Sequence, residues 1–254
     1  MKWIATRVRQ GELLCGAWLN LGSSLTAEIA GLAGFDWVCI DLEHGAGDFS
    51  ELVGQLQALE STPAAAIVRI AANEPPRFKR ALDLGPAGIM VPYVNSAAEA
   101  ERAVAAMRYP PKGIRGVAKM NRAVRFGSDF DHYFATANDN LTLLAQIETR
   151  EAVANAREIA AVDGVTAIFV GPLDLSVSLG IPQQYSHPDF VQALDTIVAA
   201  CRQAGKALGI LCPGPAEIPR YLEWGFTIVA ASSDGSMVQA GMKNLADAFR
   251  KHKG

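Results

Sequence analysis

Three titratable side chains follow one apolar segment of the sequence at short spacing. In "WVCIDLEHG" (37–45) the apolar run ends near Asp41, and Glu43 and His44 come within the next three residues. An aspartate close to a histidine can orient the imidazole ring and raise its basicity, which suits a general acid or base. A lone histidine is more often a surface residue, so the cluster indicates catalysis only if the fold places it in a site.

Two more carboxylates follow apolar segments later in the chain. Glu148 ends "LTLLAQIE" (141–148), and Asp174 lies in "GPLDLS", which overlaps the end of "AIFVG" (167–171). Neighbouring strands lie about 4.8 Å apart, so carboxylates at two adjacent strand ends can share one divalent ion. Oxygen ligands favour Mg²⁺ or Mn²⁺, with Co²⁺ or Zn²⁺ as the other options. The alternative is that Glu148 opens a helix and Asp174 caps one.

Arg69 lies near the end of a third apolar segment, "AIVRI" (66–70). A guanidinium at such a position needs an anionic partner, which Asp41, Glu43 or a substrate carboxylate can supply. An ion pair with a purely structural role is the alternative. The segment "SSDGS" (232–236) is either an anion-binding turn at a helix N-terminus or an ordinary turn and cap.

Strand-like and helix-like segments alternate along the chain, and these elements must position the residues named above. The strand-like segments are short and apolar without alternation, which is typical of strands buried on both faces. The eight expected strands cover 13–19, 37–42, 66–70, 88–94, 141–148, 167–171, 207–212 and 226–232. Amphipathic helices are expected over 23–34, 49–62, 96–109, 149–162, 186–205 and 236–254.

This alternation predicts an α/β fold, a (β/α)8 TIM barrel formed as one domain by residues 1–254. The active site of such a barrel lies at the carboxyl ends of its strands, where the candidate residues would meet. The alternative fold is an open doubly wound sheet, although no GxGxxG or GxxxxGK[ST] motif accompanies it. An inserted segment at about 110–140 interrupts the alternation, and we expect it to be a lid or to reach into a neighbouring subunit.

The composition argues against several kinds of partner. The 254 residues carry a net charge of −3 and no basic run, so we expect no nucleic-acid partner. Neither a run of about 18 apolar residues nor an apolar signal core occurs, so we expect no membrane segment and a cytoplasmic protein. The cysteines lack metal-binding or redox spacing, which fits a reducing compartment. They are Cys15, Cys39, Cys201 and Cys212.

Taken together, these motifs resemble those of the HpcH/HpaI aldolase family. The family comprises class II, metal-dependent, pyruvate-specific aldolases, such as 4-hydroxy-2-oxoheptanedioate aldolases and 2-keto-3-deoxy sugar-acid aldolases. The likeness covers nearly the whole chain, and the combination of "QIET", "GPLDLS" and "DLEH" is specific, whereas each motif alone is weak. The matching segments are "FDWVCIDLEHG" (35–45), "ALDLGPAGIMVPYVNSAAEAE" (81–101), "RYPPKGIRGV" (108–117), "VGPLDLS" (170–176), "GKALGIL" (205–211) and parts of 68–75 and 146–155.

The resemblance implies roles for the residues at the strand ends. Glu148 of "QIET" and Asp174 of "GPLDLS" would be ligands of the divalent metal. The backbone from Gly171 to Asp174 would bind the carboxylate of pyruvate. Leu173 stands where the family often has a small residue, so it would shape the aldehyde pocket. The substrate-binding residues implied in this way are Gln146, Gly171, Pro172, Leu173 and Asp174.

The resemblance also implies a set of catalytic residues. His44 would be the general base or acid in a dyad with Asp41, and Arg69 would stabilise the enolate and the aldol oxygens. Asp83 of "LDLG" matches a family aspartate thought to raise the basicity of the histidine. Because we expect Asp83 at the bottom of the barrel, it would act across a subunit interface. The family tends to form homo-hexamers with an exchanged C-terminal helix.

The function implied is that of a lyase. It would cleave hydroxy-keto acids reversibly into pyruvate and an aldehyde with the help of a divalent metal, and it would decarboxylate oxaloacetate as a side activity. A Schiff-base aldolase would need a lysine at the carboxyl end of a strand, but Lys206 precedes its strand and Lys119 lies in the inserted segment. A phosphoenolpyruvate or keto-acid lyase and a non-catalytic barrel that binds a keto acid are the remaining alternatives. Glu43 receives no role.

Overall fold

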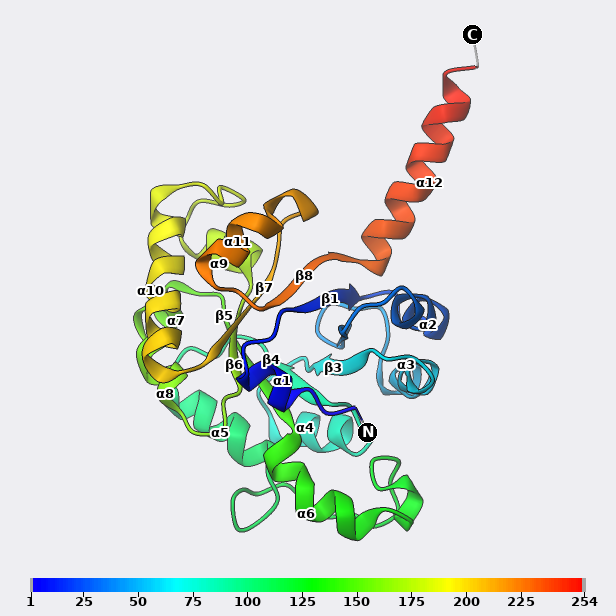
Figure 1. The fold of residues 1–254 in the computed structure, drawn as a ribbon, viewed down its shortest axis with the longest axis vertical. Coiled ribbons are helices and arrows are strands. Elements are labelled where there is room, and N and C mark those ends of the chain that lie inside the picture. The colour runs from blue at the N-terminus through cyan, green and yellow to red at the C-terminus, as the bar shows by residue number, and fades with distance from the viewer. Residues whose placement is uncertain (1, 253–254) are drawn as a thin grey trace.

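A closed barrel of eight parallel strands forms the centre of the protein (Figure 1). The computed structural model describes residues 2–252. The strands are β1 Leu14–Leu19, β2 Trp37–Asp41, β3 Ala65–Arg69, β4 Gly88–Val91, β5 Thr142–Ile147, β6 Ala167–Val170, β7 Ala207–Leu211 and β8 Ile228–Ser233. They follow one another around the barrel in chain order, and β8 pairs with β1. The predicted (β/α)8 TIM barrel is confirmed, and the open doubly wound sheet is wrong.

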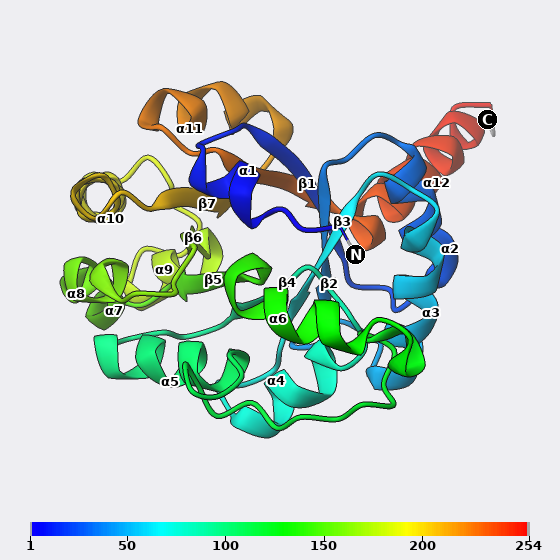
Figure 2. The same cartoon turned by 60° about the horizontal axis from the view of Figure 1, so that its bottom comes forward.

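Helices surround the barrel, and all but the first and the last lie between consecutive strands (Figure 2). They are α1 Ala5–Arg9, α2 Ser24–Leu32, α3 Phe49–Glu60, α4 Pro75–Leu82, α5 Ala97–Met107, α6 Phe130–Asn140, α7 Arg150–Ala154, α8 Ala156–Ala161, α9 Pro172–Ser178, α10 Pro188–Ala204, α11 Ile218–Trp224 and α12 Asp234–Arg250, with short 3₁₀ turns η1 Arg125–Gly127 and η2 Pro215–Glu217. Within residues 2–252, no helix has the length and hydropathy that crossing a bilayer requires.

Local sequence explains where several helices begin and end. Ser23 caps α2, Ser96 caps α5, and Gly205 ends α10 in the left-handed conformation, where glycine is favoured. The single helix expected over 149–162 is broken into α7 and α8 at Asn155, whose backbone is not helical. The final helix starts two residues earlier than expected because the Ser233 hydroxyl caps it. Its predicted end at 253–254 lies outside the described residues.

Large aromatic side chains fill the interior of the barrel. Trp18, Trp37 and Phe169 contact one another with ring centroids 5.5 to 6.2 Å apart. A Cβ atom at Gly16 would lie 2.2 Å from the Trp37 ring, so the glycine makes room for that ring. The interior is therefore a packed core, and substrate access is restricted to the mouth.

The inserted segment packs at the amino-terminal end of the barrel. The main-chain N–H of Ala123 donates to the Asp83 carbonyl, and Arg115 forms an ion pair with the Asp83 carboxylate at 2.9 Å. Figure 1 shows α6 at this end, beside the N-terminus. The expectation of a lid over this chain's own mouth is therefore wrong, because these contacts tie the segment to the opposite end.

Candidate active site

The barrel brings the predicted strand-end residues to its carboxyl-terminal mouth. Asp41 ends β2 and is the register partner of Arg69 at the end of β3. Ile147 pairs with Val170 in the same way, so the residues that follow them, Glu148 and Gly171, come together. A Cβ atom at Gly171 would lie only 2.4 Å from Glu148 Oε2. The parallel register thus joins sequence positions that are far apart.

Arg69 binds two carboxylates at once. Its Nε and Nη2 donate to Asp41 Oδ1 and Oδ2 at 2.9 and 2.7 Å, and its Nη1 lies 2.9 Å from Glu43 Oε2. Burial would raise the pKa of Asp41, but the hydrogen bonds and charge of Arg69 outweigh it and lower that pKa. Burial also raises the pKa of Glu43, and there Arg69 and His44 offset it only in part. Asp41 and Glu43, the two carboxylates predicted as partners of Arg69, therefore both form ion pairs with it.

The His44 ring lies outside this ion-pair cluster. Its side chain is 67% exposed, and its Nε2 lies 4.0 Å from Glu43 Oε1. Asp41 accepts hydrogen bonds from the main-chain N–H groups of Glu43 and His44, not from the imidazole. The expected pairing of the Asp41 carboxylate with the His44 ring is not formed, because the guanidinium fork of Arg69 occupies both carboxylate oxygens. A catalytic role for His44 stays a prediction.

Glu148 is a deeply buried carboxyl group. It is 2% exposed, and its Oε1 and Oε2 accept hydrogen bonds from the Tyr93 main-chain N–H at 2.8 Å and from Gln146 Nε2 at 3.2 Å. Burial raises its pKa to about 7; the Tyr93 N–H opposes this rise, while Asp174 and Glu43 add to it. The predicted substrate contact Gln146 keeps its Oε1 buried without a partner in the described residues.

The donors around Glu148 fit a divalent cation. The charge of Arg69 opposes the raised pKa of this buried carboxyl group only in part, and a cation beside Glu148 and Asp174 would add the positive charge that is still needed. Oxygen donors of this kind suit Mg²⁺ or Mn²⁺, which retain open positions for water and substrate. Within residues 2–252, no group of three or more His, Cys, Asp or Glu side chains could hold a metal. Glu148 and Asp174 as ligands of a metal therefore stay a prediction.

Tyr93 is a site residue that the sequence reasoning missed. Its hydroxyl donates to Asp174 Oδ1 at 3.3 Å, in addition to the N–H contact with Glu148. The signal was present, because Tyr93 follows β4 at the carboxyl end of the barrel, where polar residues were sought after the other strands.

Other predicted positions lie away from the mouth or have structural roles. Asp83 ends α4 at the amino-terminal end of the barrel. Lys206 lies directly before β7, and its Nζ donates to the Val162 and Val165 carbonyls. Lys119 lies over the Phe130 ring in the inserted segment. Neither lysine can form a Schiff base at the mouth.

The segment "SSDGS" (232–236) caps α12. The Asp234 carboxylate is buried and accepts hydrogen bonds from the Asn20 N–H and the Thr26 hydroxyl at 2.8 and 2.6 Å. The Ser233 hydroxyl accepts from the Ser236 N–H. The Asp234 carboxylate thus accepts the hydrogen bonds that a bound anion would need. The segment is therefore a turn and helix cap, which was the second of the two interpretations of its sequence.

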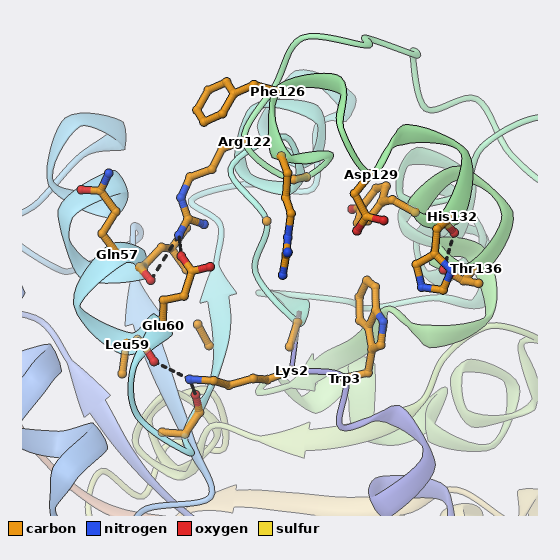
Figure 3. Close-up of a pocket in the computed structure, with 18 residues that line it drawn as sticks. Lys2, Trp3, Gln57, Leu59, Glu60, Arg122, Phe126, Asp129, His132 and Thr136 are labelled. Atoms are coloured by element: carbon orange, nitrogen blue, oxygen red, sulfur yellow. Dashed lines mark hydrogen bonds and ion pairs between the residues drawn. The ribbon is translucent and has the colours of Figure 1, made fainter.

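A cavity of about 690 Å³ lies at the far end of the barrel from this site (Figure 3). It is open on one side and is lined by the first residues, α3 and the inserted segment. Figure 3 shows Arg122 bound to Glu60 on one side of it and Lys2 directed at the Leu59 carbonyl. None of the predicted strand-end residues lines this cavity, so it is separate from the mouth.

The position of the titratable cluster at the strand ends places the protein among the (β/α)8 barrel enzymes. Residues 14–240 match the model of one family of such barrels, described as HpcH/HpaI aldolase/citrate lyase. The chain belongs to this family, and the resemblance noted in its sequence is confirmed.

Individual relatives agree with this assignment. The 5-keto-4-deoxy-D-glucarate aldolases of Salmonella arizonae and Salmonella paratyphi A are 47% and 48% identical over 240 residues, which are 94% of this chain and 93% of each relative. A family member from Burkholderia cenocepacia is 38% identical with a TM-score of 0.93, over 97% of this chain and 98% of that one. The citrate synthase SbnG is 27% identical with a TM-score of 0.88 over 100% of both chains. The protein is an enzyme, a lyase of the class II aldolase type.

Proposed function

We propose that the protein cleaves a 4-deoxy-5-keto hexarate such as 5-keto-4-deoxy-D-glucarate into pyruvate and tartronate semialdehyde. The observation that carries the cleavage chemistry is the buried Glu148 carboxyl group beside Asp174, next to the cluster around Arg69. The choice of substrate follows the relatives that are 47% and 48% identical. In such a substrate the bond between C3 and the C4 methylene breaks. The C3 hydroxyl loses its proton as the aldehyde forms, and the three-carbon keto fragment gains one to become pyruvate.

Each half of the site has a distinct part in this reaction. A divalent ion held by Glu148 and Asp174, Mg²⁺ or Mn²⁺ in first place and Co²⁺ or Zn²⁺ otherwise, would polarise the keto carbonyl as a Lewis acid. The backbone from Gly171 to Asp174, with Pro172 in it, binds the carboxylate of the pyruvate half. Gln146 contacts this half as well. Leu173, which is 49% exposed, lines the path of the aldehyde half.

Proton transfer and charge stabilisation fall to the neighbouring cluster. The exposed His44 ring accepts and returns the proton through a water molecule, with Glu43 4.0 Å from it. Arg69 keeps a fixed positive charge beside the developing oxyanion because Asp41 and Glu43 hold its guanidinium in place. Asp83 acts on the histidine of a neighbouring subunit. The same site would decarboxylate oxaloacetate, which also passes through the enolate of pyruvate.

Cleavage of 5-keto-4-deoxy-D-glucarate, followed through pyruvate with lactate dehydrogenase, tests the proposal. We expect turnover with added Mg²⁺ or Mn²⁺, its loss in EDTA, and a fall of at least about a hundredfold in Glu148→Gln. Leu173→Ala is the matched control at the same loop, which should change the preference among aldehydes but keep cleavage. If metal-loaded protein neither forms pyruvate nor exchanges the methyl protons of pyruvate in D₂O, the barrel is a keto-acid-binding protein and the proposal is wrong.

We propose that the protein works as a homo-oligomer, a hexamer in which α12 is exchanged between subunits. Figure 1 shows α12 leaving the barrel, and Asp234 is its only buried residue among those described. Its exposed apolar residues and those of α2 would cover one another in such an assembly. They are Met237, Val238, Met242, Leu245 and Phe249 on α12, and Leu25, Ile29 and Leu32 on α2. The cytoplasm is the proposed compartment, because all four cysteines are free thiols.

A further inference from the structure

Tyr93 has a backbone conformation that is uncommon for a bulky residue. Its φ angle is +51°, in the left-handed region that disfavours a Cβ atom. In this conformation its main-chain N–H reaches Glu148 Oε1 at 2.8 Å, and its hydroxyl reaches Asp174 Oδ1 at 3.3 Å. One residue of the loop after β4 therefore contacts both carboxylates, which lie directly after β5 and in the first turn of α9.

The surrounding loops hold Tyr93 in place. The Asn95 side-chain amide donates to the Tyr93 carbonyl at 3.2 Å, and the Thr149 hydroxyl donates to Asn95 Oδ1. Asn155 Nδ2 donates to the Asn95 carbonyl at 2.7 Å. These bonds join the loop after β4 to the segment that directly follows Glu148. Strained residues that are fixed by several neighbours in this way are concentrated at functional sites.

We propose that Tyr93 is a positioning residue that sets the orientation of both carboxylates through two different groups. Its N–H fixes the direction of the Glu148 carboxylate, and its phenol fixes Asp174. The inference rests on the proposed function, which assigns these carboxylates to a divalent ion. Groups that orient metal ligands in this way typically contribute about 10–100-fold to metal affinity. The Tyr93 side chain is 46% exposed, so removing its hydroxyl leaves no buried cavity.

Titration of the metal-free protein with Mn²⁺, with free Mn²⁺ measured by electron paramagnetic resonance, tests this role. In Tyr93→Phe the N–H contact remains and the phenol contact is lost, so we expect the Kd to rise about tenfold. The unfolding temperature without metal should stay unchanged, and kcat should return towards the wild-type value at saturating Mn²⁺. Tyr93→Gly also frees the backbone at this position, so its Kd should rise further than that of Tyr93→Phe.

Two control variants separate this inference from the proposed function. Tyr185 is a second tyrosine near Asp174, and the negative charge of Asp174 adds to the effect of burial in raising its pKa. Its hydroxyl makes no hydrogen bond to Asp174 in the described part of the chain, so Tyr185→Phe should bind Mn²⁺ like the wild type. Glu148→Gln should abolish tight binding; wild-type affinity there would overturn the metal site itself. Loss in Glu148→Gln together with an unchanged Kd in Tyr93→Phe would overturn the role of Tyr93 alone.

Discussion

At the scale of single residues, the site depends on how one buried carboxyl group is enclosed. Glu148 receives two hydrogen bonds, yet burial and acidic neighbours still raise its pKa to about 7. Gly171 is the third component, because its missing side chain leaves room for the carboxylate. The position of the Glu148 carboxylate therefore requires a glycine at 171 as well as the two hydrogen-bond donors.

Gly171→Ala tests this close approach. The new Cβ atom would lie 2.4 Å from Glu148 Oε2, closer than such atoms can come, so the carboxylate must move. The φ angle of −94° at this position is acceptable for alanine, so the backbone gives no separate reason for failure. We expect cleavage activity to fall at least about a hundredfold, measured with the coupled pyruvate assay. Gly214→Ala, a position with open space around its Cβ, is the control; similar activities in the two variants would contradict the prediction.

At the scale of elements, the parallel register turns strand ends into a site. Asp41 and Arg69 face each other only because β2 and β3 are in register at that residue. The ion pair is almost fully buried, with side-chain exposures of 2% and 10%. The pair therefore connects the two strands and also holds the arginine at the mouth.

The stability provided by this pair should depend on pH in a defined direction. The folded chain lowers the pKa of Asp41, so its contribution is complete above the unfolded value of about 3.9 and is lost as the pH falls through the folded pKa. Asp41→Asn should lower the free energy of unfolding by about 3 kcal/mol at pH 7. Urea unfolding of both proteins from pH 7 to 3 should show this difference shrinking only below about pH 4. A difference that is constant down to pH 3 would contradict the assignment.

At the scale of the whole molecule, contacts within one chain do not explain why α12 is present. It extends from the barrel with an apolar surface on a helix that makes few contacts beyond its first turn (Figure 1). Such a helix has little tertiary stabilisation by itself. A partner subunit would bury these residues, and it would bring a second chain's residues near the barrel.

That residues 1–254 form one domain also stays a prediction.

The double variant Leu245→Glu, Phe249→Glu tests the role of α12 in assembly. These side chains are 62% and 64% exposed in the single chain, so the changes should cost little within the subunit. If they are buried between subunits, charged replacements should dissociate the oligomer. We expect a smaller mass in size-exclusion chromatography with light scattering, while Lys243→Gln on the same helix should keep the wild-type mass. Equal masses for all three proteins would exclude this interface.

The sequence by itself determined the eight strands and the residue types at their ends, but it did not predict the helices α1, α4, α6, α9 and α11. Eight apolar segments predicted eight strands, since burial on both faces requires continuous apolar runs. A (β/α)8 order then fixes which end of each strand is the mouth, so Asp41, Arg69, Glu148 and Asp174 were found without coordinates. These features could be predicted because each of them depends on residues that are close together in the sequence.

Only the tertiary structure decided how these residues are paired. Sequence spacing favoured Asp41 for His44, but the register gives Asp41 to Arg69 and leaves Glu43 beside the imidazole. The position of Tyr93 after β4 could be read from the sequence, but its two contacts could not, because they depend on a left-handed backbone angle and on two loops distant in sequence. Pairing depends on distances between strand ends, and closure of the barrel sets those distances.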